Sequence, residues 1–205
     1  ARRHRAGSND LRTAAGVPCV VMAHGIGATQ DSGLDGFAAG LAAAGAEVIR
    51  FDYRHFAAST GQPRQLVSPA RQIEDYLAVV RHARRLDGVD PARVLVWGVS
   101  FSGGHVLRVA ALDPDVAGVI SLTPATDGAA VVASMLRSQP ASYFRTLTVL
   151  AVRDAWAGFR GRTPVLAPLV AEPGQPAALN SPGALEGMLA TAGPSWRNEF
   201  AARLF

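Results

Sequence analysis

The sequence from Gly98 to Ser102 (GVSFS) places a serine, Ser100, between small residues that directly follow the apolar run Arg93 to Trp97 (RVLVW). A serine on a sharp strand-to-helix turn is exposed because the backbone turns too tightly to bury it, and only small residues fit beside it. Its hydroxyl could attack a carbonyl carbon and hold the acyl group as a covalent intermediate. Ser102 stands where the general pattern G-x-S-x-G has its last glycine, half a turn into the following helix. Ser100 is therefore the predicted nucleophile.

A second glycine-containing turn, His24 to Gly27 (HGIG), follows another apolar run, Val17 to Ala23. Attack on a carbonyl group produces a negatively charged oxygen, which two backbone N–H groups fixed in advance can stabilise. We expect the amides of Ile26 and Phe101 to be these donors, with Gly25 allowing the turn to approach the serine closely. The sequence thus predicts an oxyanion site between two strand ends, in which the histidine orders the loop rather than moving protons.

The histidine that would activate Ser100 is missing from this sequence. Serine is a poor nucleophile at its free pKa and needs an imidazole that is itself held by a carboxylate. The usual chain order in such enzymes is serine, acid, histidine. Four of the five histidines precede Ser100, and His105 follows it by little more than one helical turn, where a partly buried helix residue is expected. No histidine follows His105, so we expect weak catalysis from these residues alone.

Strands and helices must alternate along the chain to hold the two turns together. Apolar runs predict strands at residues 17–23, 47–53, 93–97 and 116–122. Helical spacing predicts helices between them at residues 35–44, 69–86 and 105–112. This alternation is typical of an α/β fold with a mostly parallel sheet flanked by helices.

The alternation fails from residue 127 onward. Helices are expected there at residues 129–137, 143–159 and 182–190, with one short strand-like run at 164–170. We therefore predict an α/β core at residues 1–127 and a largely helical lid or cap insertion at residues 128–205.

Composition argues against several other classes of protein. Hydrophobic residues make up 49% of the 205 residues and charged residues 18%, which indicates a globular chain with a sizeable core. The 20 basic residues are all arginines scattered along the chain, so the net charge of +4 does not indicate a nucleic-acid-binding patch. Cys19 alone forms no disulfide or thiolate cluster, and no apolar segment approaches the length of a membrane span. We expect a cytoplasmic protein with no membrane association, no nucleic-acid partner and no metal.

Three segments, PCVVMAHGIGAT, RFDYRHFAAS and VLVWGVSFSGGHVL, resemble α/β-hydrolase-fold serine hydrolases. They are most similar to the bacterial dienelactone hydrolase, serine aminopeptidase and X-Pro peptidase-like groups. The resemblance covers residues 17–128 well, and the remainder resembles, less specifically, the helical lid that some of these enzymes insert after the sixth of eight strands. It implies hydrolysis of an ester, thioester or amide bond of a small-molecule acyl substrate through an acyl-enzyme on Ser100, with no cofactor. It also implies truncation at both ends, with the first two strands largely missing and the C-terminal core strands absent.

The same resemblance leaves the catalytic acid open. Asp127 lies where a minority of this fold's members carry the acid, yet it could equally cap the first helix of the lid. Asp52 matches a residue that is usually structural, and Asp154 and Glu186 are expected on solvated faces of lid helices. The alternative to a hydrolase is a non-catalytic remnant of the fold that binds a ligand or partner without turnover. Substrate identity and oligomeric state stay open.

Overall fold

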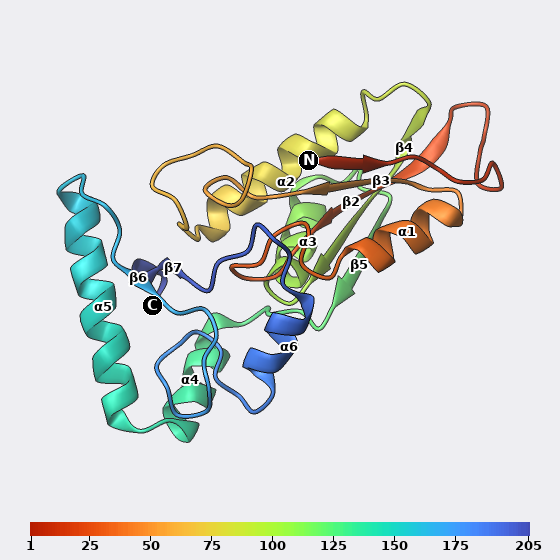
Figure 1. Ribbon diagram of the computed structural model, residues 1–205. Helices are drawn as coiled ribbons and strands as arrows, with labels where there is room; N and C mark the ends of the chain where they lie inside the picture. Colours follow the sequence, from red (N-terminus) through yellow and green to blue (C-terminus); the bar gives the residue numbers. More distant parts are fainter.

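The computed structural model describes residues 1–205 and contains a five-stranded sheet with helices on both faces (Figure 1). The strands are β1 (Arg2–His4), β2 (Val17–Ala23), β3 (Glu47–Phe51), β4 (Val89–Val99) and β5 (Gly118–Leu122), and they lie in the order β1-β3-β2-β4-β5. Strands β3, β2, β4 and β5 run parallel, whereas β1 pairs antiparallel with β3. The prediction of an α/β fold with a mostly parallel sheet is confirmed.

Strand β1 is the one strand of this sheet that the sequence did not predict. Its residues are polar and carry no run of apolar side chains, so no hydrophobic pattern indicates it. Backbone pairing with β3 and an ion pair between Arg3 and Glu47 hold it at the sheet edge instead. The expected count of four strands is therefore corrected to five.

The two faces of the sheet are covered by different helices, and alternate residues of the strands face each side. On one face, α1 (Asp35–Ala43) packs against Val20, Met22 and Val48. On the other, α2 (Pro69–Ala83) and α3 (Phe101–Leu112) pack against a larger cluster that includes Val21 and Val96. Every residue of β2 and β3 is buried, as a strand covered on both faces requires.

The last third of the chain contains α4 (Gly128–Ser138), α5 (Ala141–Phe159), α6 (Ala184–Thr191) and the short 3₁₀ helix η1 (Ala202–Leu204). Between them, β6 (Leu166–Ala167) and β7 (Phe200–Ala201) form a two-stranded antiparallel sheet. Leu169 and Phe200 join the buried cluster that lies under α2 and α3, so this part of the chain packs on the core. None of the helices is both long and apolar enough to cross a membrane.

The expectation of a solvated Asp154 is wrong. This side chain is fully buried and accepts hydrogen bonds from the Arg203 side chain at 2.7 and 2.8 Å, and from the Val165 and Arg203 amides at 2.8 and 2.9 Å. Its partners lie up to 49 residues further along the chain, which periodicity cannot show. Glu186 on α6 is exposed, as expected.

Candidate functional site

Ser100 occupies a sharp bend between β4 and α3, with backbone angles of φ 56° and ψ −116°. A non-glycine residue with a positive φ is strained, and such strain persists only where the surroundings fix the backbone. The Ser100 N–H donates to the Leu122 carbonyl at 2.9 Å, and its own carbonyl accepts from the Ala125 and Gly104 amides at 2.9 and 3.2 Å. Three hydrogen bonds therefore hold the bend, two of them to the end of β5 and the residues just after it.

The small residues around Ser100 are required by close backbone approaches. A Cβ atom at Gly98 would overlap the carbonyl of Ser102, and one at Gly104 would overlap the carbonyl of Ala125. Any larger side chain at either position would force the elbow open. Steric exclusion of a Cβ atom therefore explains why glycine occupies these two positions.

Ser102, in contrast, is fully buried and does not compete with Ser100 as a nucleophile. Its hydroxyl oxygen accepts from the Val99 N–H at 2.9 Å and lies 2.9 Å from the carbonyl oxygen of Ala23, to which it donates. The serine that replaces the last glycine of G-x-S-x-G thus links the turn at Ser100 to the end of β2. Sequence reasoning recognised only that serine is small enough for this place.

The loop that follows β2 lies against Ser100. Strands β2 and β4 are parallel neighbours, with Ala23 paired to Gly98, so the turns that follow them emerge at the same edge of the sheet. A Cβ atom built on Gly25 would lie 3.4 Å from Ser100 Cβ and 3.8 Å from its Oγ. The fold therefore brings together the two turns that the sequence singled out.

His24 orients the peptide group between Gly25 and Ile26. Its Nδ1 lies 2.9 Å from the Gly25 carbonyl oxygen, which can only accept, so Nδ1 carries the proton. In a trans peptide the N–H points opposite to the carbonyl, so this bond turns the Ile26 N–H away from His24. The Ile26 N–H donates to no protein group. Burial lowers the pKa of His24, which keeps the ring neutral.

Asp52 fastens the same loop from its other end. Its carboxylate accepts from the Gln30 backbone N–H at 2.7 Å and from the Gln30 side chain at 2.6 Å, and one oxygen lies 3.9 Å from His24 Nε2. This agrees with the structural role expected for Asp52. The part played by Gln30 was missed, because nothing in the local sequence marks it.

Phe101 is the first residue of α3, so its N–H has no acceptor within the helix. It directly follows the serine that carries the candidate nucleophilic oxygen. The amides of Phe101 and Ile26 thus come from the two turns that meet at Ser100.

None of the five histidines forms a hydrogen bond with Ser100. His105 is buried on α3 with its Nε2 2.9 Å from Gln72 Oε1, and burial, with a smaller effect of His24, lowers its pKa to about 4. His55 is also buried, His82 is exposed on α2, and His4 accepts from Arg50 at 3.1 Å in the edge pairing. No histidine of residues 1–205 is therefore placed to accept the proton of the Ser100 hydroxyl.

Asp127 is exposed and caps α4, accepting from the Ala130 N–H at 2.9 Å. The one histidine within ion-pair distance of a carboxylate is His24, beside Asp52, and not beside Asp127. Of the two roles that the sequence allowed for Asp127, the structure shows the helix cap. It shows no contact that a catalytic acid would make.

The described residues contain no group of three His, Cys, Asp or Glu side chains placed to hold a metal ion. A cavity of about 960 Å³ is lined by residues of the loop after β3, the end of α5 and residues 194–203. No residue of the serine elbow or of the His24–Gly27 turn lines it. The chemistry of Ser100 and this cavity are therefore separate features.

Comparison with known proteins gives a consistent result. A family profile described as "alpha/beta hydrolase fold" matches residues 18–204. The chain is 43% identical over 207 residues to the "Quorum-quenching protein AidA" of Acinetobacter baumannii, covering 96% of this chain and 67% of that protein. It is 34% identical over 157 residues to "Thiohydrolase aneE" of Aspergillus aculeatus, covering 77% of this chain and 49% of the relative.

Among solved structures, the fold is similar to that of "Alpha/beta hydrolase GrgF from Penicillium sp. sh18". The TM-score is 0.75 at 24% sequence identity, and the match covers 98% of this chain and 64% of the other. The chain thus spans about half to two thirds of the length of the proteins that it matches.

Proposed function

This chain belongs to the alpha/beta hydrolase fold family, and on that premise we propose that it is part of a serine hydrolase with Ser100 as the nucleophile. One observation carries the proposal. Ser100, whose backbone is strained, lies against the Gly25–Ile26 turn, and the buried His24 orients the free Ile26 amide in that turn. Strain of this kind at a non-glycine residue is typical of functional sites.

In the proposed reaction, Ser100 Oγ attacks the carbonyl carbon of an acyl substrate. The carbonyl oxygen becomes negatively charged, and the amides of Ile26 and Phe101 donate to it. The C–O or C–S bond to the leaving group breaks and leaves an acyl-enzyme, which water then hydrolyses. We propose an ester or thioester over an amide, because relatives are named as thiohydrolases.

The proton of Ser100 needs an acceptor, and no histidine of the 205 residues reaches it. We infer that the general base comes from outside these residues. Asp127 stays a proposal for the acid that would hold such a base, alongside an acid outside the chain. Membership of the dienelactone hydrolase, serine aminopeptidase and X-Pro peptidase-like group also stays a prediction.

We further propose that residues 128–205 act as a lid over Ser100. Leu169 packs so closely on Gly27 that a Cβ atom there would lie 2.8 Å from its methyl carbons, and Ser195 donates to Asp31 at 2.9 Å. This part of the chain therefore contacts the loop that bears the Ile26 amide. The substrates would be esters or thioesters whose acyl group binds beneath it.

The experiment measures p-nitrophenyl acetate hydrolysis and labelling by a fluorophosphonate probe in the 205-residue chain. We expect slow turnover, on the order of 10³ to 10⁴ over water, because only binding and oxyanion effects are left without the base. This residual turnover does not need the Ser100 hydroxyl, but covalent labelling does. Ser100→Ala should therefore abolish labelling by the probe, whereas Ser134→Ala, on an exposed face of α4, should keep the wild-type labelling. Turnover typical of a complete hydrolase would contradict the inference of a missing base.

A second candidate, a non-catalytic member of the fold that binds without turnover, is favoured by the absence of a histidine partner for Ser100. The same experiment separates the two functions. If the wild-type chain is labelled no faster than Ser100→Ala, the binding function is supported and the hydrolase proposal fails.

A further inference from the structure

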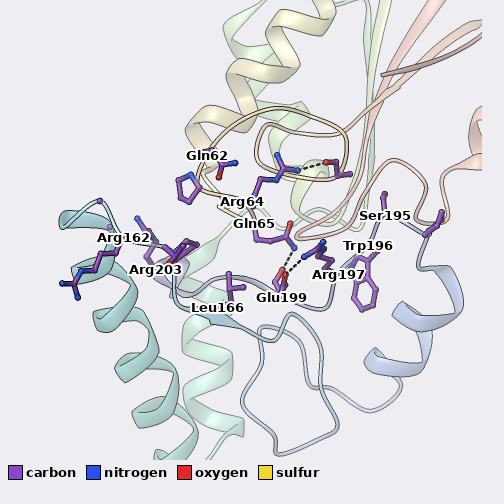
Figure 2. A pocket seen from close by; sticks show the side chains of 17 residues that line it. Gln62, Arg64, Gln65, Arg162, Leu166, Ser195, Trp196, Arg197, Glu199 and Arg203 are labelled. Carbon is purple, nitrogen blue, oxygen red and sulfur yellow. Dashed lines mark hydrogen bonds and ion pairs between the residues drawn. The ribbon is translucent and has the colours of Figure 1, made fainter.

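The cavity described above has walls from three segments that are far apart in the sequence (Figure 2). Residues 57–65, after β3, form one wall. The end of α5 with residues 161–166 forms a second, and residues 194–203 form the third. Its volume of about 960 Å³ is within the range of pockets that hold small organic ligands. We call it the arginine cavity.

The lining of the arginine cavity is strongly basic. Four arginines, Arg64, Arg162, Arg197 and Arg203, line it, and Glu199 is the one carboxylate among its lining residues. A basic concave surface concentrates anions, because the walls focus the field into the cavity.

Two of the four arginines form no ion pair. Arg64 donates to the carbonyl oxygens of Ala57 and Ser59, each at 2.6 Å, which fixes its guanidinium without neutralising it. Arg162, exposed at the rim, makes no ion pair in the structure. These two side chains belong to different walls, and Figure 2 shows the Arg162 guanidinium extending outward, away from Arg64.

The other two arginines are paired, but not fully. Arg203 forms a bidentate ion pair with the buried Asp154 through Nε and Nη2. The Nη1 atom of Arg203 has no hydrogen-bond acceptor. Arg197 Nη1 lies 3.6 Å from Glu199 Oε1, and the Arg197 side chain is 74% exposed. An exposed pair at this distance contributes little, so an incoming anion can compete for Arg197.

The walls of the cavity are fixed to each other before any ligand arrives. The side chain of the buried Gln65 donates from Nε2 to the Glu199 carbonyl at 2.8 Å (Figure 2), and its backbone carbonyl accepts from the Ala201 N–H at 2.8 Å. Two hydrogen bonds thus join the first wall to the third. A preformed cavity loses less conformational entropy when it binds.

We propose that the arginine cavity binds a small organic anion, a carboxylate or a phosphate monoester, whose apolar part packs beside Trp196 and Leu166. Guanidinium groups recognise both oxyanions through charge-assisted hydrogen bonds. Trp196 and Leu166 are the larger apolar side chains of the lining. The inference does not depend on Ser100, so it stands or falls separately from the proposed hydrolysis.

The test is calorimetric titration of the 205-residue chain with phenyl phosphate, phenylacetate and benzyl alcohol, at low and at high salt. We expect the wild-type chain to bind at least one of the two anions, with an affinity that falls as salt rises, and to bind benzyl alcohol at least about tenfold more weakly. Comparison of the two anions distinguishes a phosphate site from a carboxylate site. Equal affinity for benzyl alcohol, or no binding of either anion, would overturn the proposal.

Variants locate the binding. The double variant Arg162→Gln and Arg197→Gln should weaken anion binding about tenfold, since both side chains are exposed and their loss leaves the fold intact. Arg153→Gln removes the same charge from an exposed position on α5 outside the cavity and should leave the Kd unchanged. Ser100→Ala should also bind normally. If Arg153→Gln weakens binding as much as the double variant, the anion binds elsewhere and the assignment is wrong.

Discussion

The hydroxyl of Ser102 donates to the carbonyl oxygen of Ala23, 2.9 Å away, and so joins the start of α3 to the end of β2. The same oxygen accepts from the N–H of Val99 at 2.9 Å. A glycine, which the general elbow pattern has at this position, can make neither bond. Ser102 therefore holds together the two strand ends from which Ser100 and the Gly25–Ile26 peptide extend.

We predict that Ser102→Ala lowers the free energy of unfolding by about 1 to 3 kcal/mol, because the buried Val99 N–H and Ala23 carbonyl lose a partner. Urea denaturation followed by circular dichroism measures the change. The matched control is Ser134→Ala on the exposed face of α4, which should change stability by less than about 0.5 kcal/mol. Equal midpoints for the two variants would show that the Ser102 bonds contribute nothing.

The strain at Ser100 predicts the opposite effect on stability. Ser100→Gly should raise the free energy of unfolding by about 1 kcal/mol, since glycine adopts the observed φ of 56° without steric cost. Ser100→Ala keeps a Cβ atom and should leave stability near that of the wild type. Thermal denaturation of the three proteins side by side checks this order. A glycine variant less stable than the alanine variant would mean that the bend is not strained.

Histidine burial predicts a dependence of stability on pH. The pKa of His105 is lowered to about 4 by burial, whereas a histidine in an unfolded chain titrates near 6.5. Between these values the unfolded state binds a proton that the folded state does not. The free energy of unfolding should therefore fall as the pH drops from about 7 to 4, by on the order of 3 kcal/mol for this residue.

His105→Gln tests this origin, because glutamine can keep a hydrogen bond to Gln72 but does not titrate. Urea midpoints at a series of pH values should show a shallower loss in this variant. The buried His24, whose pKa is also lowered, should keep some of the slope. His82→Gln, at an exposed position on α2, should retain the full slope of the wild type. If His105→Gln loses stability with falling pH as steeply as the wild type, groups other than His105 cause the pH dependence.

The sheet and the elbow could be predicted from the sequence because short-range patterns determine them. The run Val17–Ala23 was predicted with the bounds that β2 has in the structure. Its residues are apolar because both faces of the sheet are covered, and this leaves a local mark in the sequence. The glycines beside Ser100 leave a similar mark, because each permits a specific backbone approach.

Other features could not be predicted, because their partners lie far away in the chain. Strand β1 is polar and exists through pairing with β3, some 45 residues later. The bond from Gln30 to Asp52 spans 22 residues and involves side chains that are common on surfaces. In such cases the local sequence carries no periodicity or motif, and only the tertiary structure shows the contact.

The buried ion pair of Asp154 and Arg203 gives the last prediction. Burial alone would raise the pKa of Asp154, but hydrogen bonds from Arg203 and Val165 outweigh it and lower the pKa below its usual value. Asp154→Asn removes the negative charge and leaves Arg203 partly buried without its counter-ion, which costs about 3 to 5 kcal/mol when such a pair is fully buried.

Because Arg203 keeps a quarter of its side chain exposed, we expect a smaller loss, of roughly 2 kcal/mol, concentrated where α5 meets η1. Hydrogen exchange should therefore increase in α5 and in residues 200–204 of Asp154→Asn, while β2 and β4 keep their protection. Glu186→Gln, at the exposed carboxylate of α6, is the control and should exchange like the wild type. Unchanged exchange in α5 of Asp154→Asn would mean that apolar packing, not this ion pair, holds the helix on the molecule.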